Sequence, residues 1–318
     1  MTGNLLTKKT RNTAAALCLL ILFLILLVLK NPAVAAECVT RALSLCARAI
    51  IPSLFPFMVL SELLIAFGFG DLFGQRLGRP LARLFGISVS SAAAVFLGFL
   101  CGFPVGARMS LALYDKGQIS KNECERLLGF SNLPSIAFLV SAVGTSLYRN
   151  RAFGLLLWLC CMASAVTVGI VTRKKEASAK EAPRTAPLSP APGAFTAAIA
   201  SATTAMLTVC AYILFFGTVI GCLSHALEGL ALPEAITALL YGFFEMSSGV
   251  SAAAALHKRP LSVMLCALTV GWSGLSVHCQ LVTLADGRGL SFRPYLCARA
   301  AQALLCALSV LILSPFVF

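Results

Sequence analysis

Long apolar runs separated by short polar segments dominate this chain. Clear runs cover residues 13–29, 51–69, 127–147 and 152–172. A membrane-spanning helix needs about 20 consecutive, mostly apolar residues, with a lower limit near 17. The pattern therefore predicts an all-α polytopic membrane protein.

One apolar run is interrupted in an unusual way. The stretch from Gly98 to Gly106 carries three glycines and one proline within nine residues. Both residue types weaken or break helices. Unpaired backbone groups are tolerated at membrane depth only where protein covers them or a polar cavity wets them. We therefore expect a re-entrant hairpin over residues 88–114 with this stretch as its tip, and a second hairpin over residues 233–256.

The second half of the chain repeats features of the first. Residues 129–133 (GFSNL) match residues 271–275 (GWSGL) at an offset of 142, and Gly98-Phe99 matches Gly242-Phe243 at an offset of 144. Interrupted hydrophobic segments in matching places of two halves are a sequence sign of a transporter's binding site. The repeat predicts two interrupted helices in addition to the two hairpins.

The distribution of Lys and Arg predicts the topology. We assume that each hairpin enters the membrane and returns to the same side. Then 16 Lys and Arg residues fall in segments on the cytoplasmic side and seven in segments outside. This agrees with the positive-inside rule. It gives seven full crossings: one at the start of the chain and then three in each half. Because three is odd, the two halves insert in opposite orientations and form an inverted repeat. The alternative is nine plain spans with incidental glycines.

Composition narrows the class of protein. The 318-residue chain is 59% hydrophobic and only 12% charged, with a mean hydropathy of +0.91, unlike a soluble domain. The net charge of +13 is explained by basic cytoplasmic loops, and we expect no nucleic-acid binding. Most of the 13 cysteines lie in apolar runs without zinc-site spacing, so we interpret them as packing residues and expect no metal site.

The chain divides into four parts. Residues 1–50 are expected to hold a first transmembrane helix, retained rather than cleaved after Ala36, and an interfacial helix over residues 37–48, for which a short surface helix is the alternative. Residues 51–172 and 199–318 form the two repeats. A charged, proline-rich cytoplasmic linker, residues 173–198, joins them.

Several motifs together resemble the YlbJ family of sporulation integral membrane proteins. They are residues 51–57 (IPSLFPF) with 61–64 (SELL), 98–107 (GFLCGFPVGA), 125–128 (ERLL) with Ser131-Asn132, and 274–280 (GLSVHCQ) with 291–295 (SFRPY). That family falls in the nucleoside-recognition Gate domain group, which is similar to concentrative nucleoside transporters.

The resemblance implies a multi-pass protein of the cell membrane or of the membranes around the forespore. It also implies transport of dipicolinic acid into the forespore during endospore formation. The repeat pattern independently favours transport of a small polar or anionic metabolite, and a nucleoside-type solute is an alternative.

The candidate substrate-binding residues lie at the two tips and the two helix breaks. Broken helices direct free N–H groups and positive dipole ends at an anion, and serine hydroxyls and amides suit a dicarboxylate. The set is Gly98, Gly102, Pro104, Gly106, Arg108, Ser131, Asn132, Glu245, Ser247, Ser248, Gly249, Ser273, His278 and Gln280. The alternative is that small residues here only permit close helix packing.

Individual members of this set have other interpretations. Arg108 either neutralises a solute carboxylate or extends to the cytoplasmic face. Glu245 takes up a proton or cation, or pairs with an arginine. His278 is either a proton relay or a histidine hydrogen-bonded between helices. Glu62, within an apolar run, is either functional or lies near a helix end, where it reaches the lipid headgroups or pairs with an arginine.

The sequence also bears on two other classes of function. A structural or scaffold protein of the spore membranes is the main alternative to a transporter. An intramembrane enzyme is disfavoured because the spans hold no HExxH, GxSxG or paired-aspartate motif, so we predict no catalytic residues and no cofactor. The expected partners are a small-molecule solute and the lipid bilayer, and a coupling ion and a homo-oligomer are compatible with this architecture.

Overall fold

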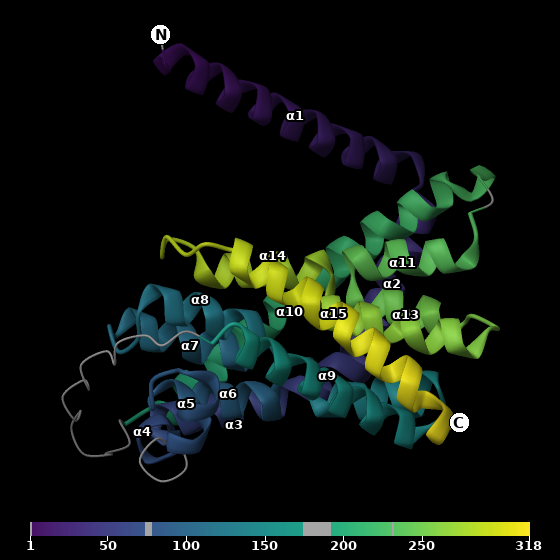
Figure 1. The fold of residues 1–318 in the computed structure, drawn as a ribbon. Helices are drawn as coiled ribbons and strands as arrows, with labels where there is room; N and C mark the ends of the chain where they lie inside the picture. The colour runs from purple at the N-terminus through teal and green to yellow at the C-terminus, as the bar shows by residue number, and fades with distance from the viewer. Residues whose placement is uncertain (1, 74–77, 174–191, 231) are drawn as a thin grey trace.

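The computed structural model describes residues 2–73, 78–173, 192–230 and 232–318 (Figure 1). Every regular element in these ranges is helical. Six helical stretches are long and apolar enough to cross a membrane: residues 12–30, 32–66, 151–171, 194–226, 259–285 and 293–316. The predicted all-α polytopic architecture is confirmed.

The first stretch precedes the repeat, and the second continues into it. Helix α1 spans Thr2–Lys30. Helix α2 (Pro32–Leu45) continues through a π-helical turn, η1 (Cys46–Ile50), into α3 (Ile51–Ala66). The residues expected to form an interfacial helix, 37–48, are helical but belong to a longer helix, because the chain stays helical through the junction into α3. At 35 residues the helix is about 52 Å long, so its first turns extend beyond a hydrocarbon layer of about 30 Å.

Two pairs of short helices occupy the positions predicted for the hairpins. The first pair is α6 (Ser91–Cys101) and α7 (Val105–Asp115), and the second is α11 (Glu234–Phe244) and α12 (Met246–Ala254). Each helix has 9 to 11 residues, about 14–17 Å, which is half of what a crossing needs. This length favours re-entrant hairpins over nine plain spans.

Two other helices are interrupted where the repeat predicts it. Helix α8 (Lys121–Phe130) is followed by a non-helical stretch, residues 131–135, and then by the π-helical segment η3 (Phe138–Leu147). Pro134 disfavours helical dihedral angles in the residue before it. Helix α13 (Arg259–Trp272) is separated from α14 (Gly274–Ala285) by Ser273, which has a φ of 75°. We call these the first and second helix breaks.

The remaining elements complete each half. Helix α9 (Arg151–Val171) follows η3, and α15 (Arg293–Leu313) follows α14. Helix α10 (Ala194–Ala226) opens the second half five residues before the predicted start at 199. Most of the predicted linker lies outside the described residues. Short segments α4 (Phe69–Phe73), α5 (Arg79–Phe85), η4 (Glu228–Leu230) and η5 (Ser314–Phe316) lie in connections and near the C-terminus.

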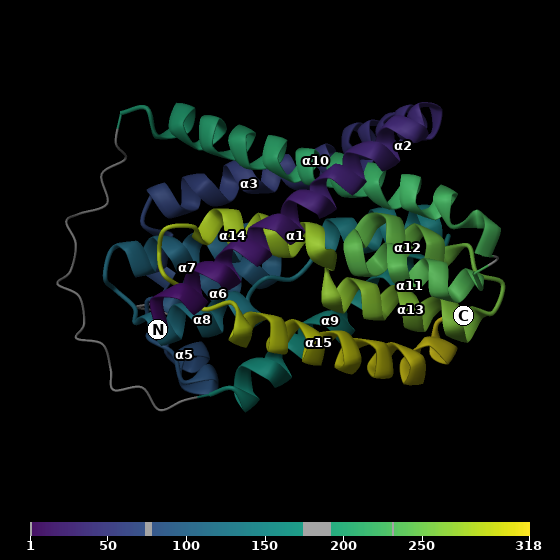
Figure 2. The ribbon, with the colours of Figure 1, turned by 90° about the horizontal axis from the view of Figure 1, so that it is seen from above.

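The two hairpins enter from opposite ends of the bundle. Helices α6, α7 and α8 lie at one end, and α11, α12 and α13 lie at the other (Figures 1 and 2). The long helix α10 passes along both groups (Figure 2). Each half contains, in order, a long helix, a hairpin, an interrupted helix and a final long helix. This order and placement are those of an inverted repeat, whose two tips point toward the centre.

Candidate functional site

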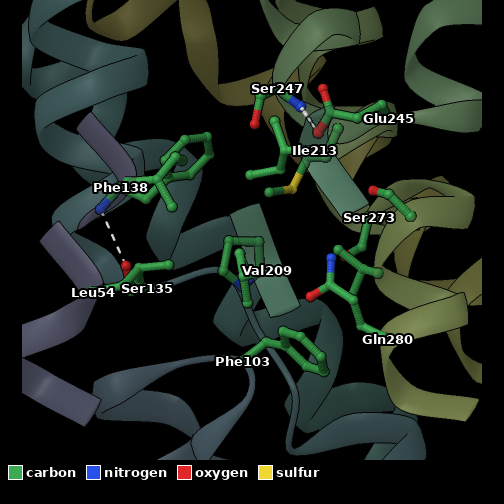
Figure 3. Close-up of a pocket in the computed structure, with 15 residues that line it drawn as sticks. Leu54, Phe103, Ser135, Phe138, Val209, Ile213, Glu245, Ser247, Ser273 and Gln280 are labelled. Atoms are coloured by element: carbon green, nitrogen blue, oxygen red, sulfur yellow. Dashed lines mark hydrogen bonds between the residues drawn. The ribbon is translucent and has the colours of Figure 1, made fainter. Parts of the chain in front are cut away.

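A small cavity lies where the tips and breaks converge (Figure 3). Its volume is about 60 Å³, enough for a few water molecules. We call it the central cavity. Its wall combines both hairpin tips, both helix breaks and the helices α3 and α10. The lining residues are Ile50, Leu54, Phe103, Pro134, Ser135, Phe138, Val209, Ile213, Glu245, Met246, Ser247, Ser273, Ser276, Val277 and Gln280.

Glu245 forms the second tip and caps its own helix. Its backbone is extended and its carboxylate oxygens accept hydrogen bonds from the N–H groups of Ser247 at 2.9 Å and Ser248 at 2.6 Å. The carboxylate therefore occupies the N-terminus of α12, which we expected to face a solute anion. Glu245 is only 2% exposed, and among the described residues that line the cavity it is the one with a formally charged side chain.

The second helix break supplies the polar groups without partners. Ser276 and Gln280, one turn apart on α14, both line the cavity. The hydroxyl oxygen of Ser276 and Oε1 of Gln280 are buried and have no hydrogen-bond partner. Because a buried polar group without a partner is costly, these two atoms mark a place for water or a polar solute.

The first tip packs against the first break. The N–H of Phe103 donates to the carbonyl of Leu133 at 2.7 Å. Gly102, with a φ of 80°, sits so close that an added Cβ would lie 2.6 Å from the Ser135 nitrogen. The Ser135 hydroxyl in turn accepts from the N–H of Phe138 at 3.2 Å. The tip thus presents the Phe103 ring, and the break presents Ser135, to the cavity.

A larger pocket of about 410 Å³ adjoins the central cavity and shares Phe103, Val209 and Gln280 with it. We call this pocket the vestibule. Polar residues from α10 and α14 line much of it, and Arg108 lies in its wall. The vestibule is lined by Phe103, Pro104, Arg108, Ser201, Thr204, Ala205, Thr208, Val209, Gln280, Thr283 and Leu284. It lies beside the N-terminal half of α10, which is the predicted cytoplasmic side.

Arg108 is paired within the protein. Its Nη2 lies 3.0 Å from a carboxylate oxygen of Glu62 and also donates to the Ser201 hydroxyl. Both members of the ion pair are about one-fifth exposed. The arginine pairing considered for Glu62 is therefore present, and the Arg108 charge is already offset before any solute arrives.

Three residues of the first half that were predicted to bind substrate instead make contacts within and between helices. An added Cβ on Gly98 or Gly106 would overlap the Ser131 carbonyl oxygen, because that carbonyl sits between the two hairpin helices. The Ser131 hydroxyl donates to the Leu127 carbonyl at 2.7 Å. These three residues are absent from the cavity wall, so for them the packing alternative describes the structure.

Five more predicted residues also lie outside the cavity wall: Gly102, Asn132, Ser248, Gly249 and His278. Gly249 packs against Gly242 within the second hairpin. Nδ1 of His278 shares a 2.7 Å hydrogen bond with the Tyr295 hydroxyl, as in the alternative of a histidine bonded between helices. Asn132 Nδ2 donates to the Leu128 carbonyl at 2.8 Å. Of the predicted set, Glu245, Ser247, Ser273 and Gln280 line the central cavity, and Pro104, Arg108 and Gln280 line the vestibule.

Two buried residues of α15 were missed by sequence reasoning. Arg299 donates from Nη1 to the Asn132 carbonyl at 3.0 Å and from Nη2 to the Ser273 hydroxyl. Gln302 donates to the Gly129 carbonyl at 2.7 Å. These bonds join α15 to both helix breaks. An arginine in the middle of an apolar span was the available signal.

Among the described residues, no group of three or more His, Cys, Asp or Glu side chains is arranged to hold a metal ion. All 13 cysteines are free thiols, and most are buried in the core or packed against it. The polar part of the cavity wall consists of serine, glutamine and glutamate side chains, and the rest of the wall is apolar.

Comparison with known proteins gives one curated relative. The chain is 27% identical over 328 aligned residues to the sporulation integral membrane protein YlbJ of Bacillus subtilis (strain 168), covering 92% of this chain and 80% of the relative. No protein-family model matches the chain. No solved structure matches it. The similarity supports the resemblance to the YlbJ family, and together with six apolar helices it makes this a multi-pass integral membrane protein.

Proposed function

Starting from its homology to the sporulation integral membrane protein YlbJ, we propose that this chain acts in the membranes of sporulating cells as a transporter of a small polar or anionic metabolite. Dipicolinic acid entering the forespore is the specific solute proposed. The observation that carries the proposal is the central cavity, because two opposed tips and two helix breaks from both halves line it together. Transporters with inverted repeats bind solutes at such a point.

The small volume of the central cavity indicates a closed conformation of the protein. Small-molecule sites commonly measure about 300–1,000 Å³, whereas the central cavity measures about 60 Å³. A dicarboxylate therefore enters only after the tips separate. Phe103 and Gln280 stand between the cavity and the 410 Å³ vestibule, so we infer a closed state in which these side chains seal the cytoplasmic approach.

Uptake of labelled dipicolinate into proteoliposomes, with and without an ion gradient, tests the proposal. We expect accumulation by the wild-type protein and a roughly tenfold or greater loss in Ser276→Ala combined with Gln280→Leu, because these groups offer the unpartnered oxygens. Ser309→Ala is the matched control, since the Ser309 hydroxyl bonds only to its own helix at the Leu305 carbonyl.

If the protein is a structural or scaffold protein, substitutions in the cavity should leave dipicolinate content unchanged. In sporulating cells, a scaffold should tolerate Ser247→Ala with Ser248→Ala, or Asn132→Ala, at normal protein levels. Normal dipicolinate content in these variants and in the Ser276–Gln280 double variant would reject the cavity as a transport site. Uptake of a labelled nucleoside in place of dipicolinate would support the nucleoside-type alternative.

A further inference from the structure

Arg299 is a buried cation at the junction of the two helix breaks. Its side chain is among the largest fully buried ones, and the residue is 1% exposed. Its guanidinium donates to the Asn132 carbonyl, the Ser273 hydroxyl and Oε1 of Gln302, while Nε has no partner. All three acceptors are neutral groups.

No carboxylate within the described ranges lies at ion-pair distance from Arg299; the pairs that form there involve other residues. A buried charge normally requires a counter-charge. The guanidinium instead contacts residues just beyond the C-terminal ends of α8 and α13, at Asn132 and Ser273. Each helix end offsets about half an elementary charge. This compensation comes from dipoles and not from a charged side chain, so the guanidinium remains a source of positive potential.

The location of Arg299 directs this potential into the central cavity. Ser273, which accepts from the guanidinium, is itself part of the cavity wall. Helix α14 begins at Gly274 without a side-chain cap, so the positive end of its dipole adds to the charge of Arg299. The unpartnered oxygens of Ser276 and Gln280 follow on the same helix.

Glu245 does not cancel this potential in the way an ion pair would. Both of its carboxylate oxygens are already hydrogen-bonded to the backbone N–H groups at the start of α12. Its negative charge is therefore partly offset by the positive end of that helix. The two buried charges stand on different elements, and among the described residues neither forms an ion pair with an oppositely charged side chain.

We propose that Arg299 is a positioning residue that makes the second helix break select a carboxylate. It acts through Ser273 and through a charge that no carboxylate neutralises directly, so that an anionic group on the solute lies against Ser273 and the start of α14. This inference rests on the proposed transport function. It adds that the group recognised on the solute is a carboxylate.

The test compares two solutes of nearly the same shape and different charge. Dipicolinate is the anion, and pyridine-2,6-dicarboxamide is its neutral counterpart. We expect wild-type proteoliposomes to take up the anion at least about tenfold more efficiently than the diamide at low concentration. Arg299→Gln should lose this preference, whereas Arg299→Lys should keep it because the charge remains.

Binding is measured separately from transport by thermal stabilisation of the detergent-solubilised protein with the same two solutes. If the wild type transports neither solute but is stabilised by dipicolinate and not by the diamide, the transport proposal fails and the anion selectivity stands. Measurable and equal uptake of the two solutes overturns the selectivity, and so does equal stabilisation, including no stabilisation by either solute. So does an Arg299→Gln variant that retains the preference.

A purely structural role for Arg299 gives a different pattern. Arg299→Lys cannot reproduce three hydrogen bonds of the planar guanidinium. If Arg299 only held the breaks together, Arg299→Lys would lose uptake of both solutes in proportion. If Arg299→Gln does not fold, as judged by size-exclusion chromatography, the wild-type comparison and the lysine variant decide the question.

Discussion

At the scale of single residues, several positions at the hairpins require a residue without a Cβ. Gly98 and Gly106 bring no functional group to a solute, yet the Ser131 carbonyl fits between them only because neither has a Cβ. Gly242 and Gly249 make a corresponding close contact in the second hairpin. The matching glycines of the two halves thus reflect a shared way of packing a hairpin.

Gly98→Ala should destabilise the protein by about 1–3 kcal/mol, the usual cost of overpacking a core. The added Cβ meets backbone atoms of Ser131 and Gly106, which cannot rotate away. Thermal unfolding of the detergent-solubilised protein measures the effect. Gly217→Ala is the matched control, since its nearest neighbour, the Ala42 Cβ, would lie 4.0 Å away. Equal melting temperatures for the two variants would contradict the argument.

At the scale of elements, each hairpin is tied to the interrupted helix of its own half. In the first half the Phe103 N–H donates to the Leu133 carbonyl at 2.7 Å. In the second half Nε1 of Trp272 donates to the Phe243 carbonyl at 3.1 Å. The broken backbone is thereby satisfied by protein, which is the condition for such backbone at membrane depth.

One ion pair joins elements from different halves at the bundle's end. Arg288, in the connection after α14, donates from Nε and Nη2 to the two carboxylate oxygens of Asp115 at the end of α7, both at 2.7 Å. These hydrogen bonds lower the pKa of Asp115 below its ordinary value. The carboxylate form is therefore stabilised by folding.

The contribution of this pair should depend on pH in a defined direction. Because the folded pKa is lowered, the stabilisation is present above the unfolded pKa of about 3.9 and is lost as pH falls through the folded value. Asp115→Asn should lower thermal stability slightly at pH 7, by about 0.2–1 kcal/mol for an exposed pair. The difference from wild type should vanish in strong acid. A difference that is the same at every pH, or the same loss in the control Asp286→Asn, would contradict this assignment.

At the scale of the whole molecule, the two halves are interlocked rather than merely adjacent. Arg299 and Gln302 from the last helix hold carbonyls of the first helix break, at Asn132 and Gly129. Phe103 from one half and Glu245 from the other line the same cavity. Rocking of one half against the other would change both sets of contacts together, as alternating access requires.

The inverted arrangement predicts which connections share a side of the membrane. Alkaline phosphatase fused after residue 149 or 257 should be active, because these connections are expected outside. Fusions after residue 117 or 289 should be inactive, because these connections are expected inside. Activity at residue 117 would instead mean that α6 and α7 do not form a re-entrant hairpin.

The sequence by itself determined the class of protein, the positions of both hairpins and both helix breaks, and the matched order of elements in two halves. These features follow from local composition, since apolar runs, glycine, proline and charged loops act through nearby residues and the bilayer. The same local patterns predicted an interfacial helix over residues 37–48, but they did not predict that these residues continue into α3 as one helix.

Only the tertiary structure decided which polar residues meet. Ser131 and Ser273 occupy equivalent positions in the repeat, yet one carbonyl packs between glycines and the other serine lines the cavity. Arg299 reaches both breaks from a helix far along the chain. Side-chain direction and contacts between distant segments depend on how helices pack, and no spacing in the sequence specifies that.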